Sequence, residues 1–154
     1  MSTHRATVDW TLPEGQDFAR GRYSRVHTLS FEGGASLPGS ASPAVVPLPW
    51  SSHDAVDPEA AFTAALSACH MLTFLDLARR AGFLATAYRD EAEGTLDRTG
   101  RGRMAVTRVV LRPRIAWAGD RRPSADDLSR LHHEAHELCF IANSVTTEVV
   151  VEPA

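Results

Sequence analysis

The stretch from Asp57 to His70, DPEAAFTAALSACH, decides the fold of this chain because it marks the start of a long helix. Asp57 can accept hydrogen bonds from the free amide groups of the first turn, and Pro58 suits the first helical position. Glu59 complements the positive end of the helix dipole. The helical pattern continues to about Arg80, so we predict a central, largely buried helix of roughly 30 Å or more.

Strand-forming segments lie on both sides of this helix. Residues 6–12 and 22–31 predict an N-terminal hairpin, and residues 36–49 carry four prolines, which predicts an extended arm with at most a short edge strand. Residues 85–95 and 105–117 predict a second hairpin. Ser124 and Asp127 resemble a capping box for a second helix that ends near Cys139, and residues 145–151 predict a last strand. This order favours a single α+β domain over residues 1–154, with the helices on one face of a mostly antiparallel sheet.

Composition excludes several classes of protein. The chain has 154 residues, 44% of them hydrophobic and 23% charged, as in ordinary globular proteins. A net charge of −3 gives no reason to expect a nucleic acid or an anionic membrane as partner. We find no secretory signal and no apolar run that approaches the roughly 20 residues of a membrane span, so we expect a cytoplasmic protein.

The chain contains only two cysteines, Cys69 in the long helix and Cys139 at the end of the second helix. In a reducing compartment two cysteines favour a transient, catalytic disulfide over a structural one. The spacing of Phe62, Leu66, Cys69 and Thr73 places Cys69 on an apolar helix face. Thiol redox chemistry is therefore the leading hypothesis.

A catalytic cysteine needs a nearby cation or hydrogen-bond donors to favour its thiolate. Cys69 lies too far from the start of its own helix for the dipole to act. No arginine occurs between Phe31 and Leu77, and Arg79 would lie about 15 Å along the helix axis from Cys69. The arginines of the first hairpin, Arg20, Arg22 and Arg25, are therefore the preferred candidates.

These residues resemble those of the OsmC/Ohr family of thiol-dependent hydroperoxide reductases. The features that carry the resemblance are an Asp-Pro-Glu sequence opening a helix, Cys69 ten residues after Glu59, Gly82-Phe83 after the helix, and the late Cys139. The order of elements matches over essentially the whole chain.

The resemblance implies an intertwined homodimer that reduces organic hydroperoxides without a cofactor or a metal. In that family the first cysteine attacks the peroxide, which corresponds to Cys69, and the second resolves the sulfenic acid as a disulfide, which corresponds to Cys139. A glutamate of the helix-opening motif holds the activating arginine, and Glu59 takes that place. We choose Arg25 as the arginine, with Arg22 in reserve. A dithiol reductant of the lipoyl type regenerates some members.

Two other interpretations remain open at the level of sequence. His132 and His136 are four residues apart, a spacing that suits two metal ligands, and Cys139 follows one turn later, so a metal-binding module is one alternative. The other is a protein of the same fold that binds a small apolar ligand without turnover. His70 and His133 are further imidazoles that the family pattern does not require.

Overall fold

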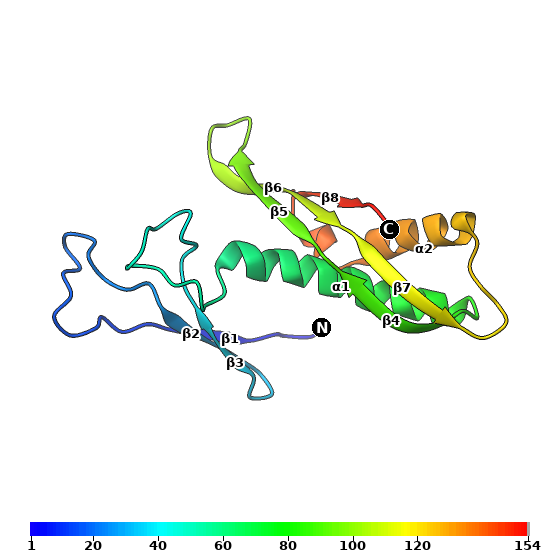
Figure 1. Ribbon diagram of the computed structural model, residues 1–154, viewed down its shortest axis with the longest axis horizontal. Helices are drawn as coiled ribbons and strands as arrows, with labels where there is room; N and C mark the ends of the chain where they lie inside the picture. Colours follow the sequence, from blue (N-terminus) through cyan, green and yellow to red (C-terminus); the bar gives the residue numbers. More distant parts are fainter. Residues whose placement is uncertain (154) are drawn as a thin grey trace. The chain divides into compact units, whose positions relative to one another are not determined.

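The computed structural model describes residues 1–153. The chain divides into two compact units, Met1–Ala61 and a second unit that begins at Phe62, and each is described by itself. Figure 1 shows the element order, with two helices and three groups of strands.

The first unit contains a three-stranded antiparallel sheet in the order β1-β2-β3. Its strands are β1 (Ala6–Asp9), β2 (His27–Phe31) and β3 (Ser36–Gly39). The pairing of the first two strands is confirmed, but residues 22–26 are not part of the strand, because Asp17 and Arg22 exchange backbone hydrogen bonds of 3.0 and 2.9 Å in a separate turn. The predicted short edge strand in the proline-rich arm is β3, where Pro38 pairs with Thr28.

Both predicted helices are confirmed. Helix α1 spans Pro58–Arg80, and its first turn is capped as expected, with the amide of Ala60 donating to Asp57 Oδ1 at 2.8 Å. Helix α2 spans Ala125–Leu138 and opens on a complete capping box between Ser124 and Asp127.

By length and composition, α1 could also cross a membrane, which differs from the expectation that no apolar run approaches that length; alanine, cysteine and methionine supply much of the hydropathy of this helix. The core helix of a soluble protein meets the same criterion. Five of the 23 residues of α1 are buried, namely Thr63, Leu66, His70, Phe74 and Ala78, so the prediction of a largely buried helix is wrong for this chain by itself.

Each strand predicted for the second hairpin is interrupted once. The strands are β4 (Leu84–Asp90), β5 (Glu93–Arg98), β6 (Met104–Leu111) and β7 (Pro113–Ala118), with β4 paired to β7 and β5 to β6. The pairing is antiparallel throughout, so the hairpin itself is confirmed. At the interruption Pro113 has no amide hydrogen, and the amide of Arg112 donates to the side-chain carboxylate of Asp90 at 2.6 Å instead of to a backbone carbonyl of a strand.

The last strand, β8 (Glu148–Val151), pairs with β6 in parallel, and a short 3₁₀ helix, η1 (Ala142–Ser144), precedes it. The pairing of β8 with β6 can be parallel because α2 carries the chain back along the sheet before β8 begins. Instead of one mostly antiparallel sheet, hydrogen bonds therefore define a β4-β7 ribbon and a mixed β5-β6-β8 sheet in this unit.

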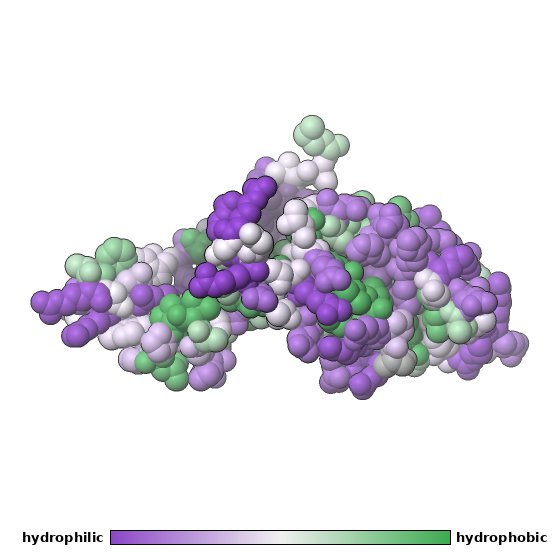
Figure 2. Space-filling view, turned by 90° about the horizontal axis from the view of Figure 1, so that it is seen from above, coloured by the Kyte–Doolittle hydropathy of each residue, from purple (hydrophilic) through white to green (hydrophobic). Residues whose placement is uncertain are grey.

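The core of the second unit consists of two apolar clusters. One joins the end of α1 to α2 and contains Phe74, Ala78, Phe83, Leu131 and Ala135. The other joins Leu66 of α1 to Val109 and Leu111 of β6. Large apolar side chains also remain at the surface. Figure 2 shows apolar patches lying between hydrophilic areas of the surface.

Candidate active site

Helix α1 presents Cys69 beside its buried face. Leu66, His70 and Phe74 form the middle of that face at spacings of four residues, and Cys69 is half-buried next to them. Thr73 Oγ1 donates a hydrogen bond of 3.0 Å to the Cys69 carbonyl oxygen, one helical turn back. The Cys69 thiol is thus held on a rigid helix without complete burial.

Helix α2 ends at Cys139, which is its C-cap residue with an extended backbone (φ −71°, ψ 111°). Its side chain is 1% exposed, and its Sγ accepts a 3.4 Å hydrogen bond from the amide of Ala142. The turn into η1 follows at once, so the second thiol lies at the junction of a helix and a loop.

The fold brings the two cysteines together. Burial, and after it a hydrogen bond to the Cys69 side chain, raise the pKa of the Cys139 thiol to about 11. A hydrogen bond that raises a thiol pKa favours the protonated form of that thiol, here Cys139. Both cysteines are free, and their contact places two thiols where one disulfide could join them.

Arg25 and Glu59 belong to the first unit. The Arg25 guanidinium donates to the carbonyl oxygens of Gly21, at 2.8 Å, and of Tyr23, and it lies 3.7 Å from the centre of the Tyr23 ring. Glu59 is half-buried in the first turn of α1. Their grouping with the cysteines, like the choice of Arg25 over the exposed Arg22, stays a prediction.

A buried histidine pair joins α1 to α2 and was not predicted. His70 Nε2 and His132 Nδ1 are 3.0 Å apart, and the two side chains are 1% and 4% exposed. The pKa of each ring is lowered to about 4; burial is the main cause for both, and the neighbouring His132 and His136 contribute to the lowering for His70. The spacing of four residues between Leu66, His70 and Phe74 is the sequence signal that places His70 in the core.

The described residues give no support to the metal-binding alternative. His132 uses Nδ1 for His70, and the Cys139 thiol contacts Cys69. Over residues 1–153, no group of three or more histidine, cysteine, aspartate or glutamate side chains is placed to hold a metal ion.

Asp90 is a second residue that sequence reasoning missed. Its carboxylate accepts a 2.5 Å hydrogen bond from Ser67 Oγ and a 2.6 Å hydrogen bond from the Arg112 amide. Its negative charge partly opposes the lowering of the His70 pKa. Asp90 therefore connects Ser67 of α1 to Arg112, the residue between β6 and β7. No local pattern in the sequence predicts these two hydrogen bonds.

Comparison with known proteins agrees with this architecture. A model of the family of OsmC-like proteins matches residues 51–154. An OsmC-like protein of unknown function from Vibrio cholerae has 49% sequence identity and a TM-score of 0.97, with 100% of both chains covered. No curated protein matches the chain.

Two more distant structures show the fold alone. An organic hydroperoxide resistance protein from Elizabethkingia anophelis has 17% identity and a TM-score of 0.70, with 99% of this chain and 94% of that chain covered. The organic hydroperoxide resistance protein OhrB of Bacillus subtilis has 14% identity and a TM-score of 0.65, with 99% and 98% covered.

Proposed function

Because the chain belongs to the family of OsmC-like proteins, we propose that it is a thiol-dependent peroxidase that reduces organic hydroperoxides to alcohols. The observation that carries the proposal is the hydrogen bond between the thiols of Cys69 and Cys139, which are 70 residues apart in the sequence. The names of the two hydroperoxide resistance proteins with this fold support the same substrate class.

The proposed reaction has two steps. The Cys69 thiolate attacks the terminal oxygen of the hydroperoxide, the O–O bond breaks, and the alkoxide leaves with a proton as the alcohol. Cys69 is then a sulfenic acid. The Cys139 sulfur displaces its hydroxyl as water and forms a disulfide, which an external dithiol reduces back to two thiols.

The environment of the two thiols supports this assignment of roles. Cys139 is 1% exposed and its thiol has a pKa of about 11, so it stays protonated and is a poor first nucleophile at neutral pH. Cys69 is only half-buried on α1, so its sulfur is the more accessible of the two to a hydroperoxide. Attack by Cys69 and resolution by Cys139 is therefore the favoured order.

The resolving step needs a small movement. A disulfide has sulfur atoms about 2.05 Å apart, closer than two hydrogen-bonded thiols. Cys139 lies where α2 gives way to the turn before η1, so its backbone can shift without unwinding a helix. Trapping the sulfenic acid quickly also prevents its irreversible oxidation.

We assign Arg25 and Glu59 to the activation of Cys69. Stacking on Tyr23 and the bonds to backbone carbonyls hold the Arg25 guanidinium in one orientation, which leaves part of its donor fork for another acceptor. A guanidinium can stabilise both a thiolate and the oxygen that leaves. Glu59 would fix that arginine, as the family resemblance implies.

We further propose a cytoplasmic homodimer that is regenerated by a dithiol, with a lipoyl group as the first candidate. Large apolar side chains exposed in each unit support a partner surface, among them Phe18, Leu72 and Phe140, which are 57%, 65% and 81% exposed. Family membership supports a soluble protein.

Consumption of cumene hydroperoxide with dihydrolipoamide as reductant tests the proposal. We expect turnover by the wild type, none by Cys69→Ser, and strongly reduced turnover by Cys139→Ser. His133→Gln, an exposed change on α2, is the matched control and should keep full activity. If the wild type consumes no hydroperoxide with either a dithiol or a monothiol, a non-catalytic ligand-binding role replaces the peroxidase.

A further inference from the structure

Asp90, at the end of β4, joins two other parts of the second unit through its carboxylate. Ser67 Oγ of α1 donates a hydrogen bond of 2.5 Å to Oδ2, and the amide of Arg112 donates one of 2.6 Å to Oδ1. Each carboxylate oxygen has its own donor, so the orientation of the group is fixed. Hydrogen bonds to a carboxylate are also stronger than those between neutral groups. Asp90 therefore ties α1 to the point where β6 ends and β7 begins.

The strand side of this connection is held by further contacts. The guanidinium of Arg112 forms ion pairs with Glu93 of β5, at 3.2 Å, and with Glu152, at 3.5 Å. The preceding residue, Leu111, is completely buried, and its carbonyl oxygen accepts a 2.8 Å hydrogen bond from the amide of Glu152. The amide of Arg112 is thus a fixed point against which Asp90 can hold α1.

One turn of α1 has contacts to the strands and to the end of α2. Leu66 packs against β6 and Ser67 bonds to Asp90, whereas Cys69 contacts Cys139. The apolar contact of Leu66 is not directional, so it tolerates rotation of the helix. The hydrogen bond of Ser67 is directional, so it resists such a rotation. Ser67 is therefore a contact that sets the rotation of α1 at Cys69, two residues further on.

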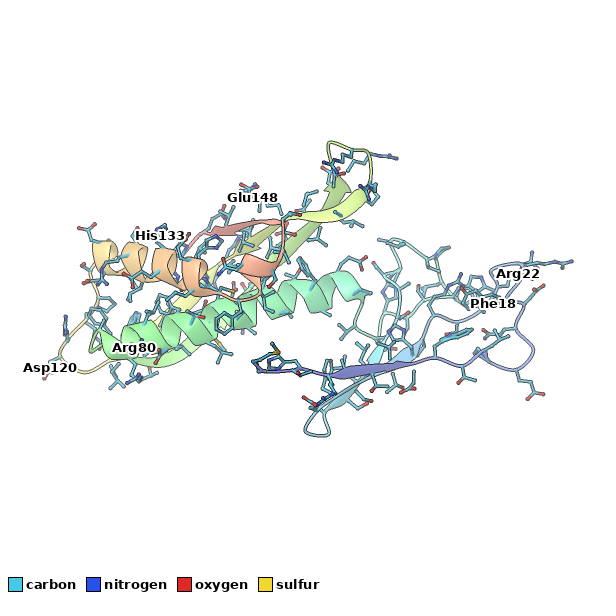
Figure 3. All side chains as sticks on the ribbon, turned by 180° about the vertical axis from the view of Figure 1, so that it is seen from behind. Phe18, Arg22, Arg80, Asp120, His133 and Glu148 are labelled. Atoms are coloured by element: carbon cyan, nitrogen blue, oxygen red, sulfur yellow. The ribbon has the colours of Figure 1, made fainter. Side chains whose placement is uncertain are left out.

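The histidine pair does not replace this contact. Figure 3 shows α2, which carries His133, beside the half of α1 that ends at Arg80. The 3.0 Å hydrogen bond between His70 and His132 joins these two helices to each other. It holds α1 to α2 but not to the strands, whereas Asp90 supplies a directional link to the strands.

Small rotations of α1 matter because a disulfide has a strict geometry. Its sulfur atoms are about 2.05 Å apart, and its Cα atoms are about 4.4–6.8 Å apart. Side chains of a helix reach a radius of about 5 Å from the axis, so a rotation of about 10° moves their ends by about 0.9 Å. A shift of that size would strain the bond between the two sulfur atoms.

From these contacts we propose that Asp90 is a positioning residue for the thiol pair. Through Ser67 it holds Cys69 in the orientation that faces Cys139, which raises the effective concentration of one thiol at the other and favours the disulfide. The inference rests on the proposed pairing of the two thiols but not on turnover of a hydroperoxide, because any oxidant of the thiol pair reveals it.

Equilibration of the full chain with mixtures of glutathione and glutathione disulfide tests the proposal. The two protein thiols lose two electrons and two protons as one S–S bond forms, and glutathione disulfide is reduced to two molecules of glutathione. Acid quenching, alkylation and mass spectrometry give the fraction of protein with an internal disulfide. Ser67→Ala and Asp90→Ala should each lower the equilibrium constant about threefold to tenfold, which is the contribution of a typical hydrogen bond.

Two matched variants separate positioning from other effects. Asp90→Asn keeps a carbonyl oxygen for the amide of Arg112 and offers an N–H donor to the hydroxyl of Ser67, so the equilibrium constant should stay near the wild-type value. Ser129→Ala makes the same deletion as Ser67→Ala at an exposed position of α2 and should leave the constant unchanged.

Three results would each overturn the proposal. They are an unchanged constant in both Ser67→Ala and Asp90→Ala, equal losses in Asp90→Asn and Asp90→Ala, and a wild type that forms no internal disulfide at any glutathione ratio. Ser67→Ala removes one oxygen atom at a half-buried position, so it decides the matter even where Asp90→Ala folds poorly. The expected losses in a protein that consumes no hydroperoxide would refute the peroxidase alone and support the role of Asp90.

Discussion

Acid should unfold this protein through the buried pair His70 and His132. Both rings have a pKa of about 4 in the folded protein, compared with 6.5 for an exposed histidine. The unfolded chain therefore binds more protons than the folded chain between pH 6.5 and pH 4, and stability must rise with pH in that window. The stabilisation is complete above about pH 6.5 and is lost as pH falls towards 4.

The size of the effect follows from the pKa difference. Each pH unit is worth about 1.4 kcal/mol per proton, so one ring contributes about 3 kcal/mol. The rings share a hydrogen bond, so the pair contributes between about 3 and 7 kcal/mol, against a total stability of about 5–15 kcal/mol for a typical domain. Loss of this amount would bring the protein close to its unfolding threshold near pH 4–5.

Urea unfolding between pH 4.5 and 7.5, at one fixed protein concentration, measures this dependence through tryptophan fluorescence. The slope of the unfolding free energy should lie between about 1.4 and 3 kcal/mol per pH unit in the wild type, for one to two protons, and should be smaller in His132→Phe. His133→Gln, a neighbour exposed to solvent, should keep the wild-type slope. A wild-type stability that is flat from pH 7 to pH 5, or an unchanged slope in His132→Phe, would refute the reasoning.

Three further predictions concern single residues. Iodoacetamide at pH 8 should modify Cys69 before Cys139, because Cys139 is 1% exposed and its thiol has a pKa of about 11. Peptide mass spectrometry over time gives the order of modification, and modification of Cys139 first would contradict the prediction. Gly94→Ala should lower stability by about 1–3 kcal/mol, because the added Cβ would lie 2.3 Å from Thr63 Oγ1. Gly100→Ala, where nothing lies within 4 Å, is its control in the same denaturant titration, and equal stabilities would count against the close contact. Ser124→Ala should cost about 0.5–2 kcal/mol by removing the capping box of α2, whereas Ser52→Ala removes a local loop bond and should cost less.

Local sequence signals were sufficient for the helices. The start of α1 at Pro58 and the capping box before α2 depend on hydrogen bonds between residues three or four positions apart, which a sequence shows directly. The edge strand at Pro38 was predictable for the same reason, since proline restricts where a strand can lie.

Contacts between distant residues were not predictable. The bond between His70 and His132 joins residues 62 positions apart, and the role of Asp90 depends on two partners from different elements. The parallel pairing of β8 with β6 likewise depends on the path of the whole chain. The two cysteines were singled out because they are rare, but only the fold shows that their thiols meet.

The most direct test of the peroxidase mechanism is to count free thiols after one equivalent of cumene hydroperoxide is added to the fully reduced protein without a reductant. The account predicts the loss of two thiols per chain and a peptide linked by a disulfide between Cys69 and Cys139. In Cys139→Ser, Cys69 should appear as a trapped sulfenic acid, and Cys69→Ser should keep its remaining thiol. Two intact thiols in the wild type, with the hydroperoxide unconsumed, would contradict the central claim.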